Sequence, residues 1–324
     1  MLTRAHCTNL CLLTILLSTP LVSSKAATLS QANESLQHGR VDEATSQLQS
    51  ILATQPANAQ AHQLLCRSYY AQDLADPSIH ECELAVANAP NDSANHLWLG
   101  RAYGLKASHA GPFTALGLAK KVRSEFEQAV AADPNNIHAA SDLGEFYIGA
   151  PGIVGGGVDK AEALASRIQP RFPAQAHRLR ALIALKKKDT VTAESEFKAA
   201  ANTSRAPEAY IDLASFYQRH DNPDQAVATI KAAIAADPAK DDALVDAASI
   251  LTSAHRAPEL AVHLLQEYLS SPARSDAAPT FKVHLQLGNL LEQRGEHIAA
   301  HNEYTAALAL ASNYTPTRKA LQTH

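Results

Sequence analysis

The 15 histidines of the chain are its most numerous candidates for metal binding and for proton transfer near neutral pH. The segment His80-Glu81-Cys82-Glu83 begins like the zinc-protease pattern H-E-x-x-H, but Leu84 stands where that pattern needs its second histidine. The cysteines also lack the paired spacing of a zinc site. The sequence therefore predicts no metal site and no cofactor.

A glycine-rich segment followed by Lys160 invites comparison with a phosphate-binding loop. Such a loop requires the spacing G-x-x-x-x-G-K-[ST] after a strand. Here Val158 and Asp159 separate Gly157 from Lys160, and a predicted helix precedes the glycines. Nucleotide binding is therefore not expected, and a net charge of −4 also argues against a nucleic-acid partner.

The elements that must position the polar residues follow a recurrent helical pattern. One helix type carries Ala, a bulkier residue four positions on, and a third residue three further, which is the spacing of one helix face. These sets are Ala44, Leu48 and Ile51; Ala193, Phe197 and Ala200; Ala226, Ile230 and Ala233; Ala300, Tyr304 and Ala307. Prolines follow several of these helices, and Pro56 and Pro90 stand 34 residues apart.

A partner helix precedes each of these helices and carries Leu, a small residue and a larger residue three further on. These sets are Leu99, Gly100 and Tyr103; Leu143, Gly144 and Tyr147; Leu213, Ala214 and Tyr217; Leu287, Gly288 and Leu291. The small residue lets two helix backbones approach closely. Aromatic residues make up only 5% of the chain, which also favours packed helices over a strand-rich barrel.

The combined pattern resembles the tetratricopeptide repeat, a helix–turn–helix unit of 34 residues. The resemblance implies an all-α, right-handed α-solenoid of about eight units over residues 27–314, followed by a truncated C-terminal capping helix over 315–324. In such an array each unit buries its apolar face against its neighbours. The usual large residue at the fourth position is replaced by His62, His96, His177 and His284. Because these histidines recur at the repeat period, we interpret them as packing residues.

Two segments are longer than the repeat requires, residues 104–113 and residues 149–157. Both fall between the two helices of consecutive units, so we expect two inserted loops that touch each other on one edge of the solenoid. One interpretation is that they are ordered connectors, in which Ile153 and Val154 fill an apolar gap. The other is that they contact a partner directly.

The resemblance implies a concave groove that receives a peptide or a partner helix, lined by the first helix of each unit. Carried over by position, the partner-binding residues are Gln63, Arg67, Tyr70, Leu97, Arg101, His138, Ser141, Glu145 and Arg178. The three arginines could form an intermittent cationic stripe that holds a carboxylate through paired hydrogen bonds. Alternatively, they pair with Glu145 and its neighbours.

Cys66 and Cys82 occupy the eighth and twenty-fourth positions of the second unit, on its two antiparallel helices. These positions lie at about the same height and face each other, so a disulfide is one hypothesis. Two buried free thiols, acting as small hydrophobic residues, are the other.

The first 26 residues read as a signal peptide: Arg4 and His6 precede an apolar run from Leu10 to Val22, and small residues follow. The sequence thus predicts an exported protein, periplasmic or secreted, without stable membrane insertion after cleavage.

Taken together, these features predict a non-catalytic scaffold that binds an unidentified protein or peptide through the concave face and the two insertions. The alternative function is an enzyme accessory or small-molecule-binding protein with a site near His109, His138 and Glu145, where a general base would need a partner within hydrogen-bond reach. A third hypothesis is self-association through an apolar end of the solenoid.

Overall fold

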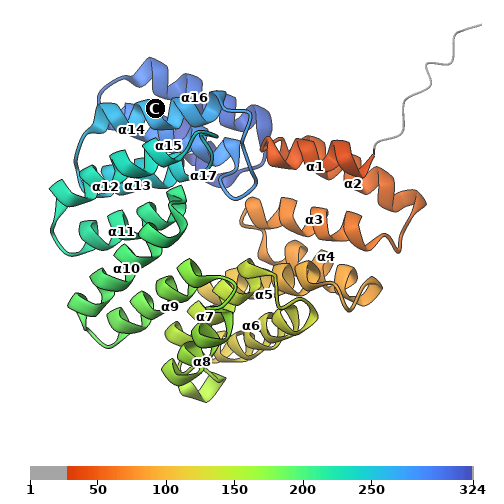
Figure 1. Ribbon diagram of the computed structural model, residues 1–324. Helices are drawn as coiled ribbons and strands as arrows, with labels where there is room; N and C mark the ends of the chain where they lie inside the picture. The colour runs from red at the N-terminus through yellow and green to blue at the C-terminus, as the bar shows by residue number, and fades with distance from the viewer. Residues whose placement is uncertain (1–27, 323–324) are drawn as a thin grey trace, which may run out of the picture.

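The computed structural model describes residues 28–322, and within them all regular structure is helical. The predicted signal peptide, with Cys7 and Cys11, lies outside the described residues. Sixteen helices of the described chain form eight antiparallel pairs, and a seventeenth helix follows them (Figure 1). The expected all-α solenoid of about eight two-helix units is thus confirmed.

The elements in chain order are α1 (Leu29–Gln37), α2 (Val41–Thr54), α3 (Ala59–Ala71), α4 (Ala75–Asn88), α5 (Ser93–Ser108), α6 (Pro112–Ala132), α7 (Ile137–Gly149), the 3₁₀ turn η1 (Gly152–Val154), α8 (Val158–Ile168), α9 (Pro173–Lys186), α10 (Thr190–Ser204), α11 (Pro207–Arg219), α12 (Pro223–Ala236), α13 (Ala243–Ser253), α14 (Pro258–Ser270), α15 (Thr280–Gln293), α16 (His297–Leu310) and α17 (Thr315–Gln322). None of the described helices is both long and apolar enough to cross a membrane.

The repeated residue pattern explains how the two helices of a unit pack. Ala300, Tyr304 and Ala307 form the buried stripe of α16, and Gly288 lies opposite them on α15. A Cβ atom at Gly288 would collide with the Tyr304 ring, so only a residue without a side chain allows this approach. The odd-numbered helices from α1 to α13 also contact one another in succession, and consequently form the inner layer of the solenoid.

The recurrent histidines join the two helices of a unit through hydrogen bonds. Nδ1 of His62 lies 2.7 Å from a Glu81 carboxylate oxygen, and Nε2 lies 2.9 Å from the Pro56 carbonyl oxygen. His96 repeats this arrangement with Glu125 and the Pro90 carbonyl. His177 and His284 contact Glu196 and Glu303, each at 2.6 Å. The packing role that we inferred is therefore a polar bridge that occupies the place of an apolar residue.

The longer segment 104–113 is not a loop, which corrects our expectation. Residues 104–108 complete α5, and Pro112 begins α6, which is 21 residues long. Leu105, Lys106 and Ala107 are good helix formers, so the additional residues lengthen both helices instead of interrupting them. The insertion 149–157 does form a loop around η1, and its Gly155 packs against Arg123 of α6. The contact that this loop makes is thus with the lengthened α6.

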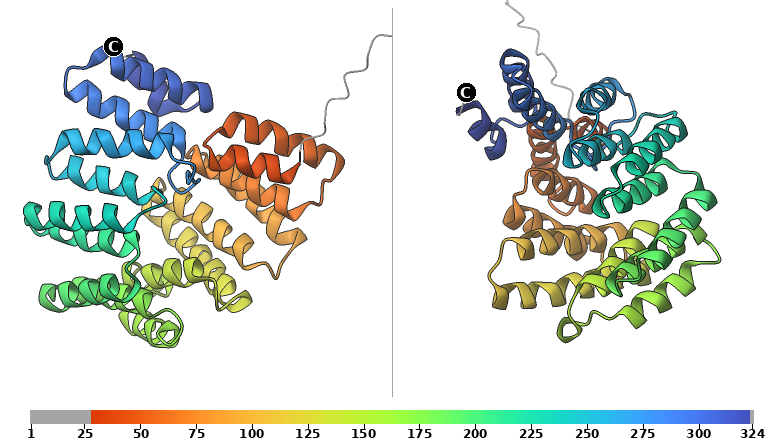
Figure 2. Two further views of the ribbon diagram at one scale, coloured as in Figure 1. Left: turned by 45° about the horizontal axis from the view of Figure 1, so that its top comes forward. Right: turned by 90° about the vertical axis from the view of Figure 1, so that its left-hand side faces the viewer.

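The two ends of the solenoid meet, so the array curves into a closed shape instead of extending (Figures 1 and 2). Phe281 and Tyr314 join Leu36 and Leu64 in one apolar cluster, with the two aromatic rings 4.9 Å apart. A Cβ atom at Gly39, where φ is +69°, would lie 2.6 Å from the Thr280 nitrogen, so the approach requires glycine. This contact covers apolar surface that we expected to be available for self-association.

Polar contacts reinforce the closure of the ring. The guanidinium group of Arg67 donates two hydrogen bonds of 2.8 Å to the Asp276 carboxylate, 209 residues away in the chain. Asp73 accepts from Lys282 at 2.8 Å and from the Tyr314 hydroxyl at 3.0 Å.

Candidate functional site

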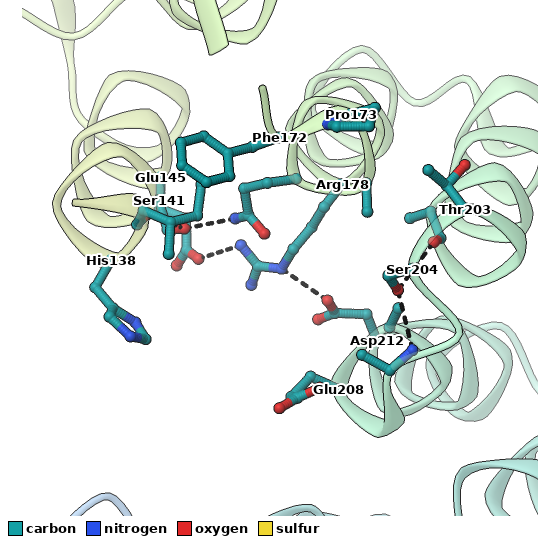
Figure 3. A pocket seen from close by; sticks show the side chains of 16 residues that line it. His138, Ser141, Glu145, Phe172, Pro173, Arg178, Thr203, Ser204, Glu208 and Asp212 are labelled. Carbon is teal, nitrogen blue, oxygen red and sulfur yellow. Dashed lines mark hydrogen bonds and ion pairs between the residues drawn. The ribbon is translucent and has the colours of Figure 1, made fainter. Parts of the chain in front are cut away.

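A cavity of about 550 Å³ opens on the inner face of the solenoid, between α7, α9 and α11 (Figure 3). Its floor is apolar and comes from Ile137, Phe172, Pro173, Ala174, Ala200, Ala206 and Ala209. Its polar lining consists of His138, Ser141, Glu145, Gln175, Arg178, Thr203, Ser204, Glu208 and Asp212. Because three successive inner helices contribute, an occupant of this cavity would run across units.

Arg178 connects the three walls of the cavity. Its Nη1 donates to Glu145 of α7 at 2.6 Å, and its Nε donates to Asp212 of α11 at 2.7 Å (Figure 3). Burial raises the pKa of Asp212, while the nearby Arg178 guanidinium acts in the opposite direction. Arg178 therefore joins three neighbouring units, and the two carboxylates that it binds neutralise its charge.

Two further hydrogen bonds fix the wall between α7 and α9. Gln175 donates to the Ser141 hydroxyl at 2.6 Å, and this hydroxyl donates to the Ile137 carbonyl at 2.8 Å. His138 is exposed on the same wall and makes no hydrogen bond with another described residue. Four of the predicted groove residues, His138, Ser141, Glu145 and Arg178, thus meet in one cavity.

The remaining predicted groove residues cluster around Trp98, on α3 and α5. The Arg67 and Arg101 guanidinium carbons lie 5.2 and 4.7 Å from the Trp98 ring centre, and the Tyr70 ring meets it edge-on at 5.5 Å. Gln63 is half-buried on α3, one turn before Arg67. Leu97 is only 4% exposed and packs in the core, so the prediction that it faces a partner is wrong.

The expected cationic stripe is also wrong, because every one of its three arginines is paired. Arg101 donates to Asp142 at 2.6 Å, Arg67 binds Asp276, and Arg178 binds both Glu145 and Asp212. These aspartates come from other units, so they were not visible in the spacing of any single repeat. The alternative, in which the arginines pair within the protein, describes the structure.

Unmatched carboxylates lie at and beside the cavity, on α11 and at the start of α13, and the groove prediction missed Asp242 and Asp246. Glu208, Asp242 and Asp246 make no ion pair with another described residue. Partial desolvation on the concave face, together with Asp242 and Asp212, raises the pKa of Asp246 to about 6. Desolvation and the Asp241 and Asp242 carboxylates likewise raise the pKa of Glu208. The sequence did hold a signal, since Asp142, Asp212 and Asp246 all occupy the sixth position of their units.

The alternative site near His109 is not assembled. His138 and Glu145 line the cavity, but His109 is the exposed C-cap of α5 and does not line it. The Glu145 carboxylate is engaged by Arg178, so it accepts a bond from a permanently charged group. The three residues therefore do not form the acid–base constellation that this alternative requires.

Comparison with known proteins assigns part of the chain to a family. A family model of the tetratricopeptide repeat matches residues 35–103, which include the first inner helices of the solenoid. These residues are tetratricopeptide repeats. No curated protein sequence matches the chain.

Solved structures are similar to this chain at low sequence identity. Yeast Tom70 is similar with a TM-score of 0.55 and 14% identity, over 93% of this chain and 64% of that one. A tetratricopeptide repeat protein of Thermus thermophilus gives a TM-score of 0.41 and 17% identity, over 75% and 100%. The APC/C hetero-tetramer Cut9-Hcn1 gives 0.41 and 13%, over 91% of this chain and 54% of that one. The present chain therefore spans about half the length of that last chain.

The second unit is closed by a disulfide between Cys66 of α3 and Cys82 of α4, whose Cα atoms are 5.3 Å apart. Both cysteines are fully buried, and the Cys66 sulfur lies 3.4 Å from the Ser78 hydroxyl oxygen. The bridge joins the inner and outer helices of the unit that carries Arg67 and Tyr70.

Proposed function

We propose that this protein is an exported, non-catalytic scaffold that binds an extended peptide segment of a partner protein on its concave face. The observation that carries the proposal is the cavity of about 550 Å³ on the inner layer, with an apolar floor and polar rim built by three successive units. Concave solenoid surfaces suit extended recognition because neighbouring units present side chains along one line.

The edge of the solenoid provides a second contact in this proposal. Phe113, in the first turn of α6, is 92% exposed, and Ile153 of the 149–157 loop is 76% exposed. Both follow the inner helices of consecutive units, so they lie on the same edge of the array. Large apolar side chains at such exposure are available to a partner that leaves the groove over this edge.

Export is the part of the proposal that concerns the compartment. It is supported by the signal-like segment 1–26 and by the Cys66–Cys82 disulfide, because such bonds persist mainly in oxidising compartments. Protein purified from its own cells should begin near residue 27, and its denatured, unreduced form should show no reactive thiol. A chain that keeps residues 1–26 and reacts as four free thiols would contradict export.

A small-molecule ligand is the second candidate, because a volume of about 550 Å³ falls within the range of ligand pockets. Native mass spectrometry of protein purified from its own cells separates the two. The scaffold proposal predicts the mass of the polypeptide alone, whereas a stoichiometric small-molecule adduct would favour the second candidate.

The proposal is tested by filling the cavity. Random 12-residue peptides displayed on phage are selected on the full chain, and their affinities are measured for Ala209→Trp and for the control Ala228→Trp. Ala209 lines the cavity, whereas Ala228 is exposed on the outer helix α12. We expect at least tenfold weaker binding for Ala209→Trp and no change for Ala228→Trp. Equal affinities for the two variants, or no selectable peptide, would contradict the proposal.

A further inference from the structure

Three aspartates occupy the same position in three units of the inner layer, Asp142 on α7, Asp212 on α11 and Asp246 on α13. The first two receive an arginine from the preceding inner helix. Arg101 of α5 donates to Asp142 at 2.6 Å, and Arg178 of α9 donates to Asp212 at 2.7 Å. In these two units the chain thus pairs the aspartate with an arginine of its own.

Asp246 lacks this arginine. Arg178 and Arg101 reach their aspartates from two different positions of their units. In α11, the inner helix that precedes the helix of Asp246, these two positions are occupied by Ile211 and Ser215. Asp246 is exposed, and its carboxylate makes no hydrogen bond or ion pair with another described residue. The groups that face it electrostatically are Asp212 of α11, with Asp241 and Asp242 at the start of its own helix. All three are acidic, and Arg178, which pairs with Asp212, is already shared with Glu145.

This acidic position is continuous with the apolar cavity. Asp212 and Glu208 are part of the cavity lining, and Figure 3 shows the Glu208 carboxylate directed away from Arg178, on the side that opens toward the following units. Glu208 in turn lies within the electrostatic reach of Asp241 and Asp242. The apolar floor of the cavity is therefore bordered by carboxylates that make no ion pair with another described residue. Among the described residues, no group of three or more histidine, cysteine or acidic side chains is arranged to hold a metal ion there.

We propose that the occupant of the concave groove is a partner peptide that carries Lys or Arg next to an apolar residue, and that its basic group supplies Asp246 with the cation that α11 does not. This inference rests on the proposed function and specifies its partner. The apolar residue fills the cavity floor, and the basic group binds Asp246, Asp242 and Glu208 through charge-assisted hydrogen bonds. Binding removes the repulsion among these carboxylates, which gives the cation its selectivity over a neutral side chain.

The test uses the phage-selected peptides in fluorescence anisotropy with the full chain. We expect the selected sequences to be enriched in Lys or Arg beside apolar residues. Changing that basic residue to Gln in the peptide, or Asp246→Asn in the protein, should weaken binding at least tenfold. The charge-matched control is Asp224→Asn, because Asp224 is exposed in the first turn of the outer helix α12. Affinity should also fall as salt rises from about 50 to about 500 mM, as expected for a screened ion pair.

The outcomes separate this inference from the proposed function. Selected peptides that are neutral or acidic, or equal affinities for Asp246→Asn and Asp224→Asn, overturn the inference; loss of binding in Ala209→Trp would then still support the groove. Binding that survives Ala209→Trp, or a selection that yields no peptide, overturns both.

Discussion

The inner layer of this solenoid has two regions that use the same unit position differently. From α3 to α9, each arginine that points to the groove is matched by an aspartate of another unit, as in the Arg101–Asp142 pair. On α11 and α13, Glu208 and Asp246 each lie within the electrostatic reach of Asp241 and Asp242, and neither makes an ion pair with another described residue. The backbone repeat is the same in both regions, so the difference is made by side chains at equivalent positions.

This difference separates stability from binding along one surface. A paired arginine holds adjacent inner helices in register, and its charge is no longer available to a ligand. An unpaired carboxylate costs stability through repulsion and desolvation, and that cost is recovered when a cation binds. The first region thus fixes the shape of the groove, and the second provides its charge selectivity.

The largest effect should come from breaking the matched region at Arg178. Arg178→Met leaves Glu145 and Asp212 facing each other in a half-buried site, which should lower the free energy of unfolding by about 2 kcal/mol. Thermal unfolding would then shift down by roughly 5 °C. Adding Asp212→Asn should restore more than half of the loss, because it removes one of the two repelling charges. An unchanged melting temperature in Arg178→Met would show that the pairing does not hold the units together.

A smaller effect is expected when the unpaired carboxylates of α11 and α13 are given an arginine like the ones on α5 and α9. Ser215→Arg places an arginine at the unit position of Arg101, before Asp246. We expect Lys- or Arg-containing peptides to bind at least tenfold more weakly, which is about 1.4 kcal/mol. Ser215→Gln is the control, because it adds length without charge. If the two variants bind alike, the arginine does not compete for Asp246.

The pH dependence of stability should identify the unmatched carboxylate. The folded pKa of Asp246, about 6, exceeds the ordinary value of 3.8, so its charge destabilises the fold as pH rises through 6. Asp246→Asn should therefore be more stable than the parent at about pH 7.5 and equal to it near pH 4. The difference between a pKa of about 6 and the ordinary 3.8 corresponds to about 3 kcal/mol, and solvent screening of this exposed side chain reduces the expected gain in stability to about 1 kcal/mol. Urea unfolding at the two pH values measures it, and a gain that is the same at both would contradict the assignment.

The smallest effect on stability is expected at the closure of the ring. Lys282–Asp73 is a partly exposed ion pair that contributes under about 1 kcal/mol. Asp73→Asn should nevertheless increase the radius of gyration in small-angle X-ray scattering, because this pair joins the two ends. Asp76→Asn is the control, since its partner Lys106 lies in the neighbouring unit. A profile identical to the control would leave the apolar contact of Phe281 as sufficient for closure.

The sequence predicted the helices and their pairing because these depend on local spacing. Leu, Gly or Ala, and Tyr recur on inner helices, and Ala stripes recur on outer ones, so each unit could be recognised separately. Segment 104–113 was misread because length was taken for a loop, although Leu105 to Ala107 favour helix. Leu97 was misplaced because the groove position was carried over regardless of residue type, whereas this apolar side chain packs in the core.

Pairing across units could not be predicted from spacing within a unit. Asp142 follows Arg101 by 41 residues, and Asp276 follows Arg67 by 209, so the second contact depends on the accumulated curvature of the whole array. The histidine bridges were closer to prediction, since Glu81, Glu196 and Glu303 each follow their histidine by 19 residues. In the lengthened unit the separation from His96 to Glu125 is 29, which reflects the longer helices.

The most direct test of a peptide-binding concave face is to locate the bound peptide. A selected peptide that carries a benzophenone group beside its apolar residue is irradiated with the full chain, and the cross-linked residues are identified by mass spectrometry. We expect cross-links on the inner helices α7, α9 and α11, at cavity residues such as Ala174 and Ala209. Cross-links concentrated on the outer helices α8, α12 and α14 would contradict a peptide-binding concave face.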